Sequence, residues 1–282
     1  MSTSSEETSD PIEECFDGLR ALHLFVEATL LGVNHAAEAT GWLEVERKLS
    51  ELKGKATAES DATHSDAKRR SQELESFARQ ERSSGHPYLY GIAVVRIWTM
   101  LEALADDVTL MRIRKGKYST ESSGIGDLKL SIKDIFGVSP ERQAEAMLAE
   151  IKQANRARVQ QGVGRFEAVL GSVSLSGPVE ESVRKALFEC CQVRNLVVHR
   201  NGIVDSKFAQ SCSWFSVAVG APLWLGKNHF QLYHQAAFCY ALSIFIRLKS
   251  LDAEVIDPMT FEVLKIYLSN VQSFQTTRPV GV

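Results

Sequence analysis

Apolar residues recur at helical spacing along most of the chain, and this pattern predicts a mainly α-helical protein. The first helical run begins at residue 11, because Asp10 can cap a helix and Pro11 suits its first turn. The pattern is strongest over residues 88–114, where one face carries an apolar stripe. The stripe comprises Ile92, Val95, Trp98, Leu101, Ala105 and Val108. Further helices are expected over residues 139–158, 180–200, 228–251 and 258–271.

Residues 42–83 carry a different pattern, with a short apolar seam inside a highly charged segment. The members of the seam follow the 3-4-3 spacing of a coiled coil. They are Trp42, Val45, Leu49 and Leu52. The apolar pattern then fades and returns weakly at Leu74 and Phe77, which favours a helical hairpin. Two interpretations stay open: a solvated pair of helices, or an arm that binds a partner or extends a dimer.

One later segment departs from helical spacing. Residues 215–225 place alternating valines and leucines on either side of a Gly-Ala-Pro turn, which predicts a short β-hairpin. The expected fold class is therefore all-α: a helical bundle with a small β-hairpin insertion and an N-terminal helical extension. The expected organisation is a disordered tail over residues 1–10, a helical extension or arm over 11–86, a helical domain over 87–275 and a C-terminal tail over 276–282.

Composition places the chain among ordinary globular proteins. It has 282 residues, of which 44% are hydrophobic and 24% are charged, and this is enough for a sizeable core. The formal net charge is −3, whereas a protein that coats long duplex DNA is usually basic. This balance still leaves room for a local basic groove that contacts a short RNA.

Targeting and redox signals favour the cytoplasm. No run of about 18 uninterrupted apolar residues indicates a membrane span, and the polar, acidic N-terminus lacks the regions of a secretory signal. The five cysteines give an odd count without a C-x-x-C pair, so we expect them to pack as small apolar residues in a reducing compartment. No metal site and no cofactor are expected.

The most informative segment is the run RNLVVHRNG, residues 194–202, at the expected end of a helix. With about 100° per residue, Asn195 and His199 are i,i+4 neighbours and Arg194 flanks them. Three apolar residues share the side of Arg194: Leu187, Cys191 and Val198. A cation and an imidazole among apolar residues predict a second surface that becomes buried. In a homodimer, two copies of the run would then form one composite cleft.

These three polar side chains suit the cleavage of a phosphodiester. The dipole at a helix C-terminus favours a protonated imidazole, so His199 can exchange a proton near neutral pH. Arg194 offers a fork of donors to a phosphate, and Asn195 can orient the imidazole or the phosphate. The reaction that these groups support is attack by an RNA 2′-OH on its own phosphate. DNA lacks this hydroxyl, so RNA is the expected substrate.

The run resembles the R-x4-6-H signature of HEPN domains, which carry a polar residue directly after the arginine. The continuation HRNGIVD is also similar to that of many family members. The resemblance covers residues 88–275 in architecture, but only the motif region is specific. It implies an α-helical dimer in which two motifs meet, and ribonuclease activity in many members, often in toxin–antitoxin or antiviral systems. It carries over Arg194, Asn195 and His199.

Three further residues are candidates for supporting roles. In HEPN-like proteins, the helix that would correspond to residues 88–114 often carries an acidic residue facing the active arginine. Here that residue is Glu102, which alternatively pairs with Arg96 or Arg112. Arg200 either binds an RNA phosphate or caps the helix end. Asn201 suits a turn better than catalysis, and it stands where one toxin branch has a tyrosine that its antitoxin modifies, so control by that route is not expected.

The leading expectation is a homodimeric, metal-independent endoribonuclease of HEPN type that leaves a 2′,3′-cyclic phosphate and a 5′-hydroxyl. RNA is the expected substrate, and an antitoxin or another defence-system protein is a candidate partner. One alternative is a non-catalytic HEPN-like scaffold that binds RNA or a protein. Others are an Arg–His pair that only holds a dimer together, and an enzyme that acts on a nucleotide.

Overall fold

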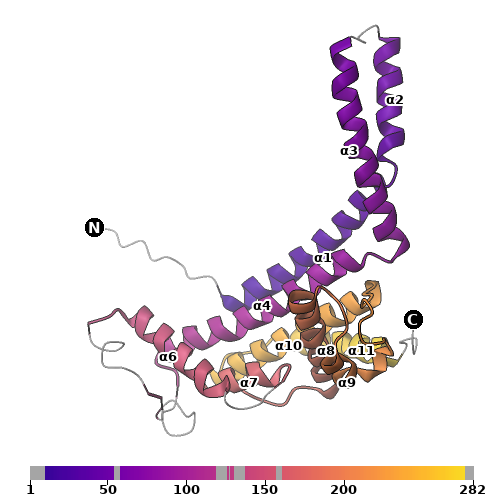
Figure 1. Ribbon diagram of the computed structural model, residues 1–282. Helices are drawn as coiled ribbons and strands as arrows, with labels where there is room; N and C mark the ends of the chain where they lie inside the picture. The colour runs from indigo at the N-terminus through magenta and orange to yellow at the C-terminus, as the bar shows by residue number, and fades with distance from the viewer. Residues whose placement is uncertain are drawn as a thin grey trace, which may run out of the picture.

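The computed structural model describes residues 10–53, 58–118, 126, 128–129, 137–156 and 161–276, and almost all of them are helical (Figure 1). The elements are α1 (Pro11–Ala36), α2 (Ala39–Leu52), α3 (Ala58–Ser83), α4 (Pro87–Arg114), α6 (Pro140–Arg156), α7 (Gly164–Gly171), α8 (Glu181–Arg200), α9 (Ser206–Ser211), the 3-10 helix η2 (Ser213–Phe215), α10 (Lys227–Leu251) and α11 (Pro258–Thr276). The all-α prediction is confirmed. The two predicted tails lie outside the described residues, apart from Asp10 and Thr276.

Helix α4 is the central element of the bundle, because α1, α6, α7, α8 and α10 all pack against it. Its residues Val94, Ile97, Leu101 and Val108 are fully excluded from solvent. By length and composition alone α4 could cross a membrane, but 61% of its apolar window is buried inside the bundle. A helix that is surrounded by others is apolar on several sides for that reason.

Helix α1 begins where the sequence predicts and joins the same core. The Asp10 carboxylate accepts a hydrogen bond from the Ile12 N–H at 2.9 Å, and Pro11 lies in the first turn. Leu19 and Val26 are buried, and α1 packs on α3, α4 and α10. The predicted extension over residues 11–86 thus contains a core helix as well as the hairpin that follows it.

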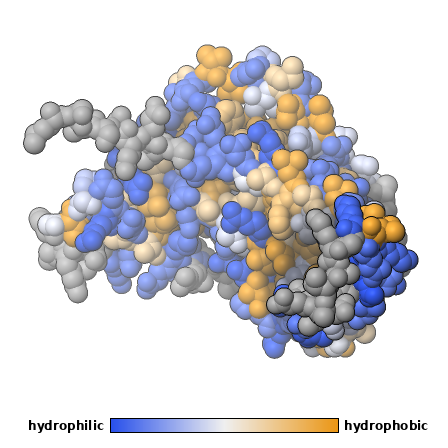
Figure 2. Space-filling view, turned by 90° about the horizontal axis from the view of Figure 1, so that it is seen from above, coloured by the Kyte–Doolittle hydropathy of each residue, from blue (hydrophilic) through white to orange (hydrophobic). Residues whose placement is uncertain are grey.

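Helices α2 and α3 form a hairpin whose outer part projects away from the bundle (Figure 1). Polar contacts join the two helices, and in one of them the Thr40 N–H donates to the Glu75 carboxylate at 3.1 Å. Where the hairpin meets the bundle, Arg79 Nε donates to the Ala37 carbonyl at 3.2 Å. No residue of α2 is buried. Seen from above, the molecular surface shows hydrophobic patches between hydrophilic ones (Figure 2).

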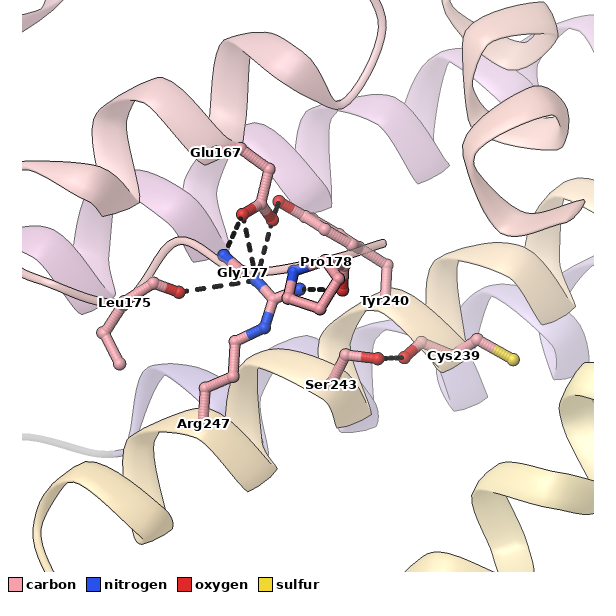
Figure 3. A network of polar contacts seen from close by, with 8 residues as sticks. All are labelled: Glu167, Leu175, Gly177, Pro178, Cys239, Tyr240, Ser243 and Arg247. Atoms are coloured by element: carbon pink, nitrogen blue, oxygen red, sulfur yellow. Dashed lines mark hydrogen bonds and ion pairs between the residues drawn. The ribbon is translucent and has the colours of Figure 1, made fainter. Parts of the chain in front are cut away.

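A polar cluster fixes the loop between α7 and α8 onto α10 (Figure 3). The Glu167 carboxylate accepts hydrogen bonds from Arg247 Nη1 at 2.9 and 3.0 Å, from the Tyr240 hydroxyl at 2.7 Å and from the Gly177 N–H at 2.8 Å. Arg247 Nη2 also donates to the Pro178 carbonyl at 2.7 Å. Burial and the nearby Glu167 raise the pKa of Tyr240 well above its ordinary value, so its hydroxyl stays a donor. The cluster therefore holds the start of α8 in place.

The predicted β-hairpin over residues 215–225 is not confirmed, because no strand lies in that segment. Residue Pro222 instead forms an isolated antiparallel bridge with Ile203, which follows α8. The Gly220 N–H donates to the Val204 carbonyl at 2.8 Å. The segment thus pairs with the residues that leave α8 and not with itself. A proline has no N–H to donate, which limits any ladder at this point.

Candidate functional site

Helix α8 carries the RNLVVHRNG run and ends within it, as the sequence predicts. Asn201 adopts the left-handed conformation with φ at 52°. The Gly202 N–H donates to the Leu196 carbonyl at 3.1 Å, which closes the helix end. His199 and Arg200 therefore lie in the last turn of α8.

The inward side of α8 packs into the bundle. Val193 and Leu196 are buried. Leu187 and Cys191 were expected on a surface covered by a second subunit, but they are buried within this chain. Of that set Val198 is exposed, at 46%. The outward apolar surface of α8 is therefore narrower than predicted, because neighbouring parts of the same chain cover most of it.

Arg194 and Asn195 form a half-buried pair. Arg194 Nη1 donates to Asn195 Oδ1 at 3.3 Å, and Asn195 Nδ2 lies 3.9 Å from the sulfur of Cys191. The Nε atom of Arg194 is buried and has no hydrogen-bond partner among the described residues. A buried donor without a partner costs about 1–3 kcal/mol, and more when it belongs to a charged group. An acceptor that enters here would recover that free energy.

The His199 imidazole lies one turn beyond Asn195 and is exposed to solvent. Residues at i,i+4 spacing are neighbours on a helix surface, so the two side chains share one side of α8. Within the described part of the chain, no side chain or backbone group forms a hydrogen bond with the His199 ring. An imidazole enclosed in the bundle could not reach a polynucleotide, whereas this one can.

Arg200 and Asn201 lie at the end of α8, where Arg200 pairs with an acidic residue and Asn201 forms the turn. Arg200 Nε lies 3.6 Å from Asp205 Oδ2, and the two side chains are 63% and 36% exposed. Exposed ion pairs of this kind contribute little to stability, so the guanidinium remains available to a phosphate. Asn201 takes the left-handed conformation that ends the helix, which supports the turn role favoured by the sequence.

Glu102 approaches the run from α4. Burial raises the pKa of the Cys191 thiol above its ordinary value, and among the charges that act on this thiol Arg165 and Arg194 lower its pKa while Glu102 raises it. Charged side chains of α4, α7 and α8 are therefore near enough to Cys191 to act on its thiol. Glu102 has no ion-pair partner among the described residues. Arg112, one of its alternative partners, pairs with another residue.

Arg165 is a residue of this region that sequence reasoning missed. It follows the turn that contains Gly162 and Gly164, and α7 begins there. Gly162 has a positive φ of 59°, and a Cβ at this position would lie 3.0 Å from the Cα of Phe188. The turn thus lies directly on α8, where only glycine fits. The signal in the sequence was the G-x-G spacing, which by itself does not name the surface that it touches.

Metal ligands and related proteins give no further constraint on the site. Within the ranges that the structure describes, no three His, Cys, Asp or Glu side chains are grouped so that they could hold a metal ion. All five cysteines are buried and unpaired, which agrees with the predicted packing role. Comparison of the chain with protein-family models, curated proteins and solved structures finds no match. The candidate site therefore rests on its own geometry.

Proposed function

We propose that this protein is a metal-independent endoribonuclease of HEPN type with Arg194, Asn195 and His199 as its catalytic residues. The observation that carries the proposal is the buried, unpartnered Nε of Arg194, which lies beside Asn195 on the helix end that exposes His199. A half-buried cation with an unused donor suits an anionic ligand. The similarity of RNLVVHRNGIVD to the HEPN motif supports the same assignment.

In the proposed reaction, the 2′-oxygen of the RNA bonds to the adjacent phosphorus while the bond from phosphorus to the 5′-oxygen breaks. The proton of the 2′-hydroxyl must leave and the 5′-oxygen must gain one, and His199 is the group that exchanges protons. Arg194 stabilises the charge that develops on the phosphoryl oxygens, and Asn195 orients Arg194 through its Oδ1. The products are a 2′,3′-cyclic phosphate and a 5′-hydroxyl. Arg200 binds a neighbouring phosphate in this scheme.

An exposed apolar patch beside the site supports a homodimer. A Cβ on Gly91 of α4 would lie 3.7 Å from Val197 of α8, so the two helices cross at this point. Next to the crossing, Ile92 and Val198 are 47% and 46% exposed, and Tyr88, one turn earlier on α4, is 65% exposed. A second copy that covers these residues would bring two RNLVVHRNG runs into one cleft.

The biological setting proposed here follows from the resemblance to HEPN proteins alone. It is a cytoplasmic toxin or an effector of antiphage defence, with an antitoxin or another defence protein as its partner. The residues themselves do not identify the RNA target or the partner.

Cleavage of a total RNA preparation in EDTA tests the proposed chemistry. His199→Ala should lower the rate at least 100-fold, since a general acid–base group contributes about 10²–10⁴. His35→Ala is the matched control, because His35 is also an exposed histidine in the last turn of a helix. Equal cleavage by the wild type and His199→Ala would reject the assigned chemistry.

Light scattering tests the dimer separately. The wild type should have twice the 31.3 kDa mass of the chain, and Val198→Lys should shift it toward the monomer. A wild-type protein that remains monomeric at micromolar concentration, with and without RNA, would remove the composite cleft.

A non-catalytic HEPN-like scaffold is the second candidate. The observation that favours it is the seam on α2, where Trp42, Leu49 and Leu52 are 60%, 50% and 84% exposed. Large exposed apolar side chains that gather on one face are typical of a surface that binds another protein. This candidate predicts no RNA cleavage by either the wild type or His199→Ala, and a partner protein whose binding is lost in Trp42→Ala.

A further inference from the structure

A hollow of about 460 Å³ lies at the N-terminal half of α8. Its walls come from α7, the loop before α8, α8 itself and η2. The lining includes two aromatic rings, two cations and two carboxylates: Phe188, Trp214, Arg184, Lys185, Glu167 and Glu181. The Glu167 carboxylate is already paired with Arg247, so Glu181 is the anion that faces the two cations. Aromatic faces beside cations in a groove are the means by which many proteins bind single-stranded nucleic acid.

The indole of Trp214 is anchored at one edge and open elsewhere. Its Nε1 donates to the Glu189 carboxylate at 2.7 Å, and the buried Glu189 also accepts a hydrogen bond from the Tyr233 hydroxyl. Trp214 is nevertheless 48% exposed. A ring that is already fixed in position loses little conformational freedom when a base stacks on it.

Arg184 and Lys185 bring positive charge to the hollow. Arg184 Nε contacts Glu181 at 2.8 Å, and Lys185 Nζ lies 3.5 Å from the same carboxylate. The side chain of Arg184 is 59% exposed, that of Lys185 66% and that of Glu181 52%. Because exposed ion pairs are weak, a phosphate can replace Glu181 as the partner of both cations.

The hollow and the candidate site occupy one side of α8. On a helix of 3.6 residues per turn, Arg184, Phe188, Asn195 and His199 fall within about 60° of one another. The helix between Arg184 and His199 is about 22 Å long, or about six stacked nucleotides at ~3.4 Å each. A strand that spans it passes over the Gly162–Gly164 turn, which covers α8 at Phe188. Arg165 acts electrostatically on the middle of this stretch and adds a further cation.

We propose that the hollow binds the part of a single-stranded RNA that lies beyond the scissile bond. One unpaired base stacks on Trp214, and the phosphates next to it contact Arg184 and Lys185. The inference rests on the proposed function for the place of the scissile phosphate at the far end of α8. Single strands are the favoured class because an aromatic ring can stack only on a base that is not paired.

Binding of fluorescein-labelled octauridylate, followed by anisotropy, tests the site without cleavage in the His199→Ala background. Adding Trp214→Leu should weaken binding about tenfold, the loss typical of one stacking platform. Trp42→Leu is the matched control, since Trp42 is 60% exposed on the distant α2 and should leave affinity unchanged. Unchanged affinity for a folded Trp214→Leu variant would overturn the proposal. If that variant fails to fold, Trp214→Phe keeps a stacking face and should bind nearly as well as the parent.

Charge variants give a second test in which the two expected effects have opposite signs. Arg184→Ala should weaken binding several-fold and reduce its salt dependence by about one phosphate contact. Glu181→Gln should strengthen binding, because it removes the anion that competes with the phosphates. The controls are Arg47→Ala and Glu51→Gln, an equally exposed pair on α2 whose Nε–Oε1 distance is 2.7 Å. Weaker or unchanged binding by Glu181→Gln would contradict the site.

Cleavage kinetics separate this inference from the proposed function. Arg184→Ala should raise the KM for octauridylate without changing kcat, and it should not alter cleavage of the dinucleotide UpU. If the wild type cleaves neither RNA but the binding results hold, the nuclease proposal fails and the binding site stands. If the wild type cleaves RNA but the Trp214 and Arg184 variants have unchanged affinity and KM, the binding site fails and the nuclease proposal stands.

Discussion

Helices α2 and α4 both carry apolar residues at helical spacing, but only α4 buries them. Ile97 and Leu101 on α4 are fully buried, whereas Trp42 and Leu52 on α2 are 60% and 84% exposed. Five helices surround α4, and α3 is the helix that packs on α2. Periodicity thus identifies an apolar face, and the number and position of neighbouring helices decide whether that face is buried.

The geometry of the hairpin explains why its seam stays open. Thr40 and Glu44 of α2 contact α3, through Glu75 and Lys68 respectively. On the helical wheel, that side of α2 lies about 140° from the seam. These two polar contacts therefore join the helices on a side of α2 that lies away from the apolar seam. Paired substitutions in the hairpin and in the bundle test this contrast.

Truncating one leucine in each region should give the largest difference. Leu101→Ala should lower the free energy of unfolding by about 3 kcal/mol, because it leaves a cavity in the core. Leu49→Ala, at a position 50% exposed on α2, should change it by less than about 0.5 kcal/mol. Urea unfolding followed by circular dichroism measures both. Equal losses would mean that another copy of the chain buries the seam in solution.

Removing an arginine from each region should give the next largest difference in the free energy of unfolding. Arg247→Ala should cost about 2 kcal/mol, because it leaves the Glu167 carboxylate, only 16% exposed, without its cation. Arg79→Ala should cost less than about 1 kcal/mol, because Arg79 is 62% exposed at the hairpin. The same urea titration compares the two, and a greater loss for Arg79→Ala would contradict the contrast.

The helix caps should differ by about 1 kcal/mol. Asp10→Ala removes the side chain that accepts from the Ile12 N–H at the start of α1, and such caps contribute about 1 kcal/mol. Glu38 precedes α2 but forms no capping hydrogen bond through its side chain, so Glu38→Ala should leave the melting temperature unchanged. A clear drop for Glu38→Ala would show that the start of α2 is held by contacts other than those described.

The pH dependence of the free energy of unfolding should be the smallest of these effects. Burial lowers the pKa of His234 below its ordinary value, while the Leu19 carbonyl, 2.9 Å from Nε2, raises it and His23 lowers it. The unfolded chain therefore takes up this proton at a higher pH than the folded chain, so stability falls as the pH drops below about 6.5. Urea unfolding at pH 7.5 and 5.5 should show a smaller decrease for His234→Gln than for the control His35→Gln. An equal decrease in both would exclude His234 as the source.

Helix boundaries were largely predictable, and the exceptions have local reasons. The last two helices were expected over residues 228–251 and 258–271, and the structure has α10 over Lys227–Leu251 and α11 over Pro258–Thr276. Two short elements, α7 and α9, were not predicted. Helix α7 has glycine at both ends, which is typical of turns, and the six residues of α9 are too few to establish a period.

In the candidate site, too, local features were predictable from the sequence and tertiary contacts were not. The placement of Arg194, Asn195 and His199 on one helix end follows from their spacing, since 3.6 residues per turn fixes which side chains are neighbours. Helix starts and ends, such as those at Asp10 and Asn201, are also local, because capping groups lie within a few residues of the groups they satisfy. Sequence by itself therefore determined the helices and the order of the polar groups on α8. Only the tertiary structure decided that the Nε of Arg194 has no partner among the described residues and that a hollow lined by Trp214 and Arg184 lies at the other end of α8. These features depend on side chains that other helices bring from distant parts of the chain, and no local periodicity encodes those contacts.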